Sequence, residues 1–218
     1  MSSFGALAHI RYVLTKRLGQ KIKIGHAGTL DPLATGVLIL CTGKMTKRIE
    51  ELQRHTKEYV ATLQLGATTA SFDQEHPVDN LYSVDHITQS LVEQSLAAFR
   101  GDIEQVPPVF SAVKIDGKRA YKHGREQSEV EMKPKTVHVD ELELMLFDAE
   151  LKQMTIRVVC GKGTYIRSLA RDIGQAMGSG AYLTSLCRTR VGEHRIEDAL
   201  TFDDFNDWLE NEGVLSCS

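Results

Sequence analysis

Hydrophobic and polar residues follow two different periods along this chain of 218 residues. Apolar residues spaced three or four positions apart predict helices, and apolar residues at every second position predict strands. Helical spacing covers residues 4–18, 88–99, 164–177 and 201–212, and strand-like patterns cover residues 58–66, 136–147 and 154–159.

Residues at the ends of these segments support the predicted boundaries. Ser2 or Ser3 is placed to cap the first helix, and Gly19 is placed to end it. Thr201 and Asp204 have the spacing of a capping box, in which each residue bonds the backbone N–H of the other. The first and last predicted helices therefore carry their own start signals.

Turn signals and the order of the elements indicate the fold class. Asp116-Gly117 predicts a two-residue hairpin turn, and the polar stretches 71–85 and 122–134 predict long loops. Neither stretch resembles a domain linker, so we expect a single domain over residues 1–218. Helices and strands do not alternate regularly as in a parallel doubly wound sheet, and the sequence therefore predicts an α+β fold.

Composition is ordinary for a soluble globular protein, with 42% hydrophobic and 25% charged residues. No apolar run approaches the length of a membrane helix, and the first residues lack the features of a signal peptide. We therefore expect a cytoplasmic protein. Cys41, Cys160, Cys187 and Cys217 are widely separated, which predicts reduced thiols and neither a disulfide framework nor a zinc site.

Charge is distributed unevenly about the net value of −3. Residues 193–218 contain eight acidic residues and one basic residue, so residues 1–192 hold 21 acidic and 25 basic residues. Basic residues also gather in two clusters. A cluster of this kind forms either a solvated face or a surface that contacts phosphates, and composition does not choose between them. The clusters consist of Lys44, Lys47, Arg48, Arg54 and Lys57, and of Lys114, Lys118, Arg119, Lys122 and Arg125.

The segment G-H-A-G-T-L-D-P-L-A-T-G-V-L, residues 25–38, carries the candidate chemistry. Its glycines allow tight turns, and Asp31-Pro32 marks an abrupt change of direction. From the residues alone, Asp31 is as well explained as a turn residue as it is as a functional carboxylate.

This segment closely resembles the signature loop of the TruB-type tRNA pseudouridine-55 synthases. The resemblance runs from about residue 3 to about residue 200, through further blocks that occur in the family's order. These blocks are K-E-Y at 57–59, L-G-A-T-T-A-S-F-D at 65–73, Q-V-P-P-V-F-S-A-V-K-I-D-G-K-R-A-Y at 105–121, V-V-C-G-K-G-T-Y-I-R-S-L-A-R-D-I-G at 158–174, and L-C-R-T-R-V-G at 186–192.

The resemblance implies a pseudouridine-synthase fold, with a largely antiparallel mixed sheet flanked by helices. It implies isomerisation of the T-loop uridine, position 55, of tRNA: the uridine is flipped out, its glycosidic bond is cleaved, and the base is reattached through C5. Because the product is an isomer, we expect no cofactor and no metal. The resemblance also implies a monomer, and an inserted segment at about residues 104–135 that contacts the T arm, with Lys114, Lys118, Arg119, Lys122 and Arg125 as RNA-binding residues.

The resemblance assigns catalytic roles to three residues. Asp31 matches the catalytic carboxylate, and Arg167 matches the arginine that pairs with this aspartate. A cation in that place would keep a desolvated carboxylate charged. Tyr59 matches the tyrosine that stacks on the target base and is the candidate for the C5 proton step. Without the resemblance, Arg167 would be read as an exposed helix residue and Tyr59 as an inward-facing strand residue.

Three more residues match positions that bind the extruded uridine. His26 matches the histidine that occupies the space left by the flipped base, and Tyr165 and Leu186 match residues that contact it. Read without the family, His26 would be structural, Tyr165 would anchor the first turn of a helix, and Leu186 would belong to the core.

Family members carry two segments that have no match in this sequence. Family members normally begin with a strand carrying a Lys-Pro-x-Gly element, and many carry a C-terminal RNA-binding module called PUA. We therefore expect the catalytic domain, with its acidic C-terminal helix at about 201–212, to bind RNA by itself. The alternative function is a noncatalytic tRNA-binding or tRNA-folding protein of the same fold. Nucleotide binding is disfavoured, because the glycines at 161–164 lack the P-loop spacing.

Overall fold

A computed structural model of the chain describes residues 1–109, 114–115, 118–119 and 132–211. These residues form two compact units. Unit 1 combines Met1–His55 with the segment that begins at Arg188, and unit 2 is Thr56–Cys187. The strand β12 (Ala181–Val191) passes from unit 2 into unit 1.

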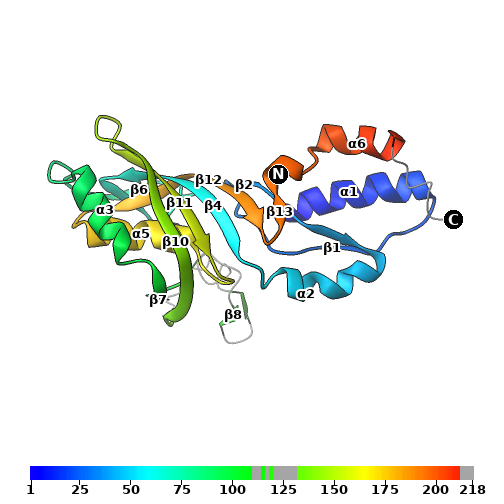
Figure 1. Ribbon diagram of the computed structural model, residues 1–218, viewed down its shortest axis with the longest axis horizontal. Helices are drawn as coiled ribbons and strands as arrows, with labels where there is room; N and C mark the ends of the chain where they lie inside the picture. The colour runs from blue at the N-terminus through cyan, green and yellow to red at the C-terminus, as the bar shows by residue number, and fades with distance from the viewer. Residues whose placement is uncertain (110–113, 116–117, 120–131, 212–218) are drawn as a thin grey trace. The chain divides into compact units, whose positions relative to one another are not determined.

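Unit 2 is built on a sheet whose strands follow the order β12, β4, β11, β10, β7. The pairs β4–β11, β11–β10 and β10–β7 are antiparallel. The helices α3 and α5 contact each other (Figure 1). The helix α3 packs against β10, and α5 packs against β4. Bounds of these elements are β4 (Lys57–Leu65), β7 (Gly101–Gln105), β10 (Lys135–Asp148), β11 (Gln153–Cys160), α3 (Gln89–Ala97) and α5 (Ile166–Ala176).

Alternation in β4 places one row of side chains in the core. Ala61, Leu63 and Leu65 are buried, and Tyr59 shares their parity but is only half-buried. From α5, the side chains of Leu169 and Ile173 are fully buried. The predicted strands at 58–66, 136–147 and 154–159 are confirmed as β4, β10 and β11. The predicted α+β class is confirmed as well.

Unit 1 packs helices around short strands. Its first core cluster consists of Ile10 and Leu14 from α1 and Leu209 from α6, so these two helices pack together (Figure 1). Its second cluster consists of Ala27, Cys41 and Leu52. The elements are α1 (Ser3–Leu18), β1 (Ile24–His26), β2 (Thr35–Gly36), β3 (Leu40–Thr42), η1 (Gly43–Arg48), α2 (Ile49–Leu52), β13 (His194–Arg195), η2 (Ile196–Asp198) and α6 (Phe202–Asn211).

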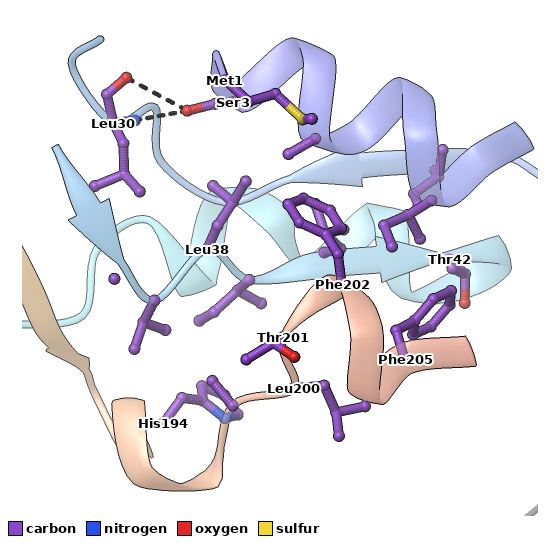
Figure 2. A pocket seen from close by; sticks show the side chains of 18 of the residues that line it. Met1, Ser3, Leu30, Leu38, Thr42, His194, Leu200, Thr201, Phe202 and Phe205 are labelled. Carbon is purple, nitrogen blue, oxygen red and sulfur yellow. Dashed lines mark hydrogen bonds between the residues drawn. The ribbon is translucent and has the colours of Figure 1, made fainter. Parts of the chain in front are cut away.

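A cavity of about 1080 Å³ lies within unit 1. Figure 2 shows Leu38 and Phe202 pointing into it and His194 at its lower margin. Its walls come from α1, from residues 34–43 and from residues 193–208. Apolar side chains dominate these walls, so the cavity is a hydrophobic one.

Both predicted ends of α1 and the predicted start of α6 are confirmed. Ser2 Oγ accepts a hydrogen bond of 3.1 Å from Gly5 N, and Gly19 adopts a φ of 65° after the last turn of α1. At α6, Thr201 N donates to Asp204 Oδ2 and Asp204 N donates to Thr201 Oγ1, both at 3.2 Å. The capping box read from the sequence is therefore formed.

Some sequence expectations need correction. The segment 71–85, predicted as one loop, contains β6 (Val78–Leu81), which pairs with β5 (Ala67–Thr69). All four residues of β6 are exposed, so no apolar alternation marked it. The helix predicted at 164–177 begins only at Ile166, because Tyr165 is still extended.

Other expectations fall on residues that the structure leaves undescribed. The turn at 116–117 and most of the predicted loop 122–134 lie outside the described residues. On either side of 116–117, β8 (Lys114–Ile115) pairs with β9 (Lys118–Arg119). Cys41, Cys160 and Cys187 are free, and Cys217 is outside the described residues. Among the helices that are described, none is long and apolar enough to cross a membrane.

Candidate active site

The segment that carries Asp31 follows β1 in unit 1 and is tied to the start of α1. Ser3 Oγ accepts a hydrogen bond of 2.8 Å from Leu30 N and lies 3.4 Å from Leu30 O (Figure 2). Asp31 O accepts a bond of 2.9 Å from Ala34 N, which closes a turn around Pro32. The backbone on both sides of the partly buried Asp31 is therefore held in place.

His26 ends β1 and lies five residues before Asp31. It pairs with Leu40 of β3. Its Nδ1 atom is buried and has no hydrogen-bond partner among the described residues. A buried polar atom without a partner costs about 1–3 kcal/mol, and such atoms call for a functional or structural explanation.

Tyr59 and Leu186 occupy the sheet of unit 2. Tyr59 lies in β4 opposite Val158 of β11, and Leu186 lies in β12 and is buried. The half-buried position of Tyr59 leaves part of its ring accessible, whereas Leu186 is 5% exposed.

The backbone of Tyr165 is fixed by the side chain of Gln105. Tyr165 N donates to Gln105 Oε1 at 2.8 Å, and Gln105 Nε2 donates to Tyr165 O at 3.1 Å. Ser168 Oγ adds a bond of 2.8 Å to Val106 O. Gln105 is 1% exposed, so the end of β7 and the start of α5 are joined by a buried pair of hydrogen bonds.

Arg167 is buried in unit 2 and is not the exposed helix residue that a reading without the family would give. Its NH1 atom donates to Ser71 O at 3.2 Å and lies 3.5 Å from Asp73 Oδ2. Arg167 and Asp73 are 4% and 1% exposed. Asp73 Oδ1 in turn accepts from Ser71 Oγ at 2.6 Å and from Glu75 N at 2.9 Å. A buried guanidinium thus lies beside a carboxylate that is itself hydrogen-bonded.

Asp73 and Gln105 were missed by sequence reasoning. Both stand inside blocks that resemble the family, at the end of L-G-A-T-T-A-S-F-D and at the start of Q-V-P-P-V-F-S. The motifs therefore contain both residues. The roles of Asp73 and Gln105, however, follow only from their burial and from their contacts with residues about 60–95 positions away in the sequence.

The predicted site residues fall in both units. Asp31 and His26 belong to unit 1, and the remaining four belong to unit 2. The pairing of Asp31 with Arg167 stays a prediction. In the described part of the chain, no group of three or more His, Cys, Asp or Glu side chains is placed to hold a metal ion.

The predicted RNA-binding residues are only partly described. Lys114, Lys118 and Arg119 belong to the paired strands β8 and β9, whereas Lys122 and Arg125 lie outside the described residues. The other basic cluster includes η1, where Lys44 and Lys47 are exposed.

Comparison with known proteins identifies a family over nearly the whole chain. Residues 15–166 match the family described as "TruB family pseudouridylate synthase (N terminal domain)", and residues 167–216 match "tRNA pseudouridylate synthase B C-terminal domain". The chain is 59% identical over 214 residues to "tRNA pseudouridine synthase B" of Phocaeicola vulgatus. It is 58% identical over 217 residues to the protein of that name from Bacteroides thetaiotaomicron. Each match covers 98% of this chain and 90% of the relative.

Solved structures with a similar fold include "Crystal Structure of a Cbf5-Nop10-Gar1 Complex", with a TM-score of 0.67 and 28% identity over 94% of this chain. Another is "Structure of H/ACA RNP bound to a substrate RNA containing 2'-deoxyuridine", with a TM-score of 0.65 and 25% identity over 97% of this chain. The chain spans about half the length of these solved chains, 53% and 52%.

Proposed function

The chain belongs to the TruB family of pseudouridylate synthases, and we propose that it isomerises a uridine in the T loop of tRNA, position 55, to pseudouridine. The observation that carries the proposal is 59% identity, over nearly the whole chain, to a tRNA pseudouridine synthase B. The segment of residues 25–38 supports it, because hydrogen bonds at Leu30 and Ala34 fix the backbone on both sides of Asp31.

Asp31 is the proposed catalytic carboxylate. The reaction breaks the N1–C1′ bond of uridine and joins C1′ to C5, while C5 loses its proton and N1 gains one, so the product is an isomer of the substrate. A carboxylate beside the sugar and base either adds covalently or stabilises the positive charge that develops as the base departs. The hydrogen bonds at Leu30 and Ala34 support this role, because a fixed carboxylate needs less reorganisation during the reaction.

Arg167 and Tyr59 are proposed to complete the catalytic group. Arg167 keeps the carboxylate of Asp31 charged, and its own orientation is set by Ser71 O and Asp73. Tyr59 stacks on the target base and takes part in the proton step at C5. Its half-buried position in a rigid strand supports this assignment.

Three further residues are proposed to hold the extruded uridine. Flipping a nucleotide out of a folded loop costs a few kcal/mol, which contacts in the pocket must offset. Tyr165 and Leu186 contact the flipped base, and His26 fills the space that the base leaves. The unsatisfied Nδ1 of His26 supports the last role, because RNA offers it a hydrogen-bond partner.

The T arm is proposed to contact the segment at residues 104–135. Residues 114–135 contain seven basic and four acidic residues, which favours contact with phosphates. Proteins recognise folded RNA largely by its shape and by splayed bases, and we expect the T loop to be recognised in this way.

The alternative, a noncatalytic tRNA-binding protein, is not favoured. The relatives at 55–59% identity are all named as synthases, and a pure binding protein would not need the complete set of Asp31, Tyr59 and Arg167.

Tritium release tests the proposal directly. A T-arm stem-loop with 5-tritiated uridine is incubated with the wild-type protein and with Asp31→Asn. We expect release from the wild type, a loss of at least about 10³-fold in the variant, and equal RNA affinity for both proteins. Asp203→Asn, which changes an exposed carboxylate of α6, serves as the control and should keep full activity. Release that persists in Asp31→Asn would overturn the assignment, and no release from the wild type would favour the binding-only alternative.

A further inference from the structure

Arg188 is a charged side chain in the interior of unit 1. It lies in the last part of β12, is 1% exposed, and is among the largest fully buried side chains of the described residues. Burial of a guanidinium is costly unless its N–H groups find acceptors, and arginine is rarely fully buried. The contacts of Arg188 therefore need an explanation.

Among the described residues, the side-chain hydrogen bonds of Arg188 go to the segment that carries Asp31. Arg188 Nε donates to Val37 O at 2.8 Å, and Arg188 NH2 donates to Gly28 O at 3.2 Å. The backbone of Arg188 joins the same segment, because Val37 N donates to Arg188 O at 2.8 Å. Gly28 precedes Asp31 by three residues and Val37 follows it by six, so a single residue bridges both arms of the segment.

Gly36 allows this close approach. A Cβ atom on Gly36 would lie 2.2 Å from Arg188 O, and Gly36 has a φ of 100°. At Gly28, a Cβ atom would make only an ordinary contact of 3.5 Å with Arg188 NH1, and the φ of 103° is what favours glycine there. Any other residue at position 36 would collide with the backbone of β12, so the segment is shaped to lie directly on Arg188.

We propose that Arg188 is a positioning residue for the catalytic step, whose guanidinium holds the two arms of the Asp31 segment together and so fixes the place of the carboxylate. The inference rests on the proposed role of Asp31. The planar fork of arginine supplies N–H donors in two directions at once, whereas the ammonium of lysine is a compact group that does not reproduce this fork. A displacement of about 1 Å in a catalytic group lowers a rate by about 10²-fold.

Arg188→Lys tests the proposal while keeping the positive charge. With saturating enzyme and 5-tritiated T-arm RNA, we expect the single-turnover rate constant to fall about 10- to 100-fold, while the dissociation constant for the RNA changes less than about 3-fold. Arg100→Lys is the matched control. The Arg100 guanidinium also donates to a backbone carbonyl, Leu142 O at 2.7 and 3.1 Å, but this carbonyl belongs to β10 and not to the Asp31 segment, so the rate should stay at the wild-type value.

Chemical rescue separates positioning from a general loss of structure. In Arg188→Ala, added methylguanidinium should restore the single-turnover rate at least 5-fold, whereas neutral methylurea should not, because only the cation supplies the missing fork. If Arg188→Ala does not fold, Arg188→Lys, checked by its melting temperature, decides the question.

The outcomes distinguish this inference from the proposed function. An active wild type with an equally active Arg188→Lys would overturn the role of Arg188 and leave the role of Asp31 intact. A parallel loss of RNA affinity and rate in a folded variant would also overturn it, because that result indicates general damage to the site. An inactive wild type would instead contradict the proposed function itself.

Discussion

At the scale of single residues, the pKa of His138 in unit 2 is set by the acidic residues beside it. It lies opposite Asp102 across β10 and β7, and its Nδ1 is 2.6 Å from Asp102 Oδ1. The hydrogen bond with Asp102 raises the pKa of His138, and the charges of Asp102 and Asp140 raise it further. Because the pKa is higher in the folded state, the protonated pair stabilises the fold below the unfolded pKa of about 6.5, and this contribution is lost as the pH rises through the folded pKa.

A titration of His138 by NMR tests this reasoning. We expect its pKa to lie above the ordinary value in the wild type and to fall toward that value in Asp102→Asn. Asp148→Asn, at the other end of β10, should leave the titration unchanged. An identical pKa in the wild type and in Asp102→Asn would show that the hydrogen bond does not set the pKa of His138.

The candidate site shows which single residues a sequence reveals. Asp31 and Arg167 were proposed as site residues because they stand in long, specific motifs. Asp73, Gln105 and Arg188 were not identified, although they lie in the same kind of block, because their roles depend on burial and on hydrogen bonds to distant backbone groups. An aspartate, a glutamine and an arginine are usually exposed, and only the packed structure shows these three to be internal.

At the scale of elements, helices and strands with local sequence signals were predicted correctly. Strands that are fully exposed or very short were not predicted. The helix α1 and the strand β4 were predictable, because capping residues and apolar alternation are encoded within the elements themselves. The strand β6 has no buried face, and β2 and β13 contain two residues each. Such strands are defined by backbone pairing, β6 with β5, β13 with β12 and β2 with β12, and no pattern of apolar side chains records that pairing.

The helix α6 provides an element-scale test, because its start depends on the capping box of Thr201 and Asp204. We expect Thr201→Ala to remove about 1 kcal/mol of helix stability. Amide exchange in the middle of α6 should then be about 5-fold faster, since local opening becomes less costly. Asn206→Ala, an exposed change within the same helix, is the control and should not accelerate exchange. Equal exchange rates in the wild type and in Thr201→Ala would show that packing against α1, rather than the cap, holds α6.

At the scale of the whole molecule, the divisions by sequence and by structure do not coincide. The two family regions meet between Ile166 and Arg167, which are the first two residues of α5. The two compact units instead divide the chain after His55 and after Cys187. A cut at the boundary of the family regions would separate β12 and nearly all of α5 from β4, against which both lie, so the two regions are not separable folding units.

The distribution of charge along the chain predicts how RNA affinity depends on salt concentration. The net charge is −3, yet residues 1–192 carry an excess of four positive charges, and part of that excess falls in residues 114–135. Each phosphate contact adds about 0.7–0.9 to the slope of log affinity against log salt concentration. We expect the combined change Lys118→Ala, Arg119→Ala and Lys122→Ala to lower that slope by about 2, measured by filter binding of a T-arm RNA between 50 and roughly 300 mM salt.

The same number of charges removed elsewhere distinguishes local contact from overall charge. Arg11, Lys16 and Arg17 are exposed on α1, and replacing all three by alanine changes the net charge by the same amount. If the segment at 104–135 contacts phosphates and α1 does not, the α1 variant should keep the wild-type slope, because the slope reports the number of phosphates that the protein contacts. Equal slopes for the two triple variants would mean that the protein attracts RNA through its total charge, and the proposed RNA contact at 104–135 would be wrong.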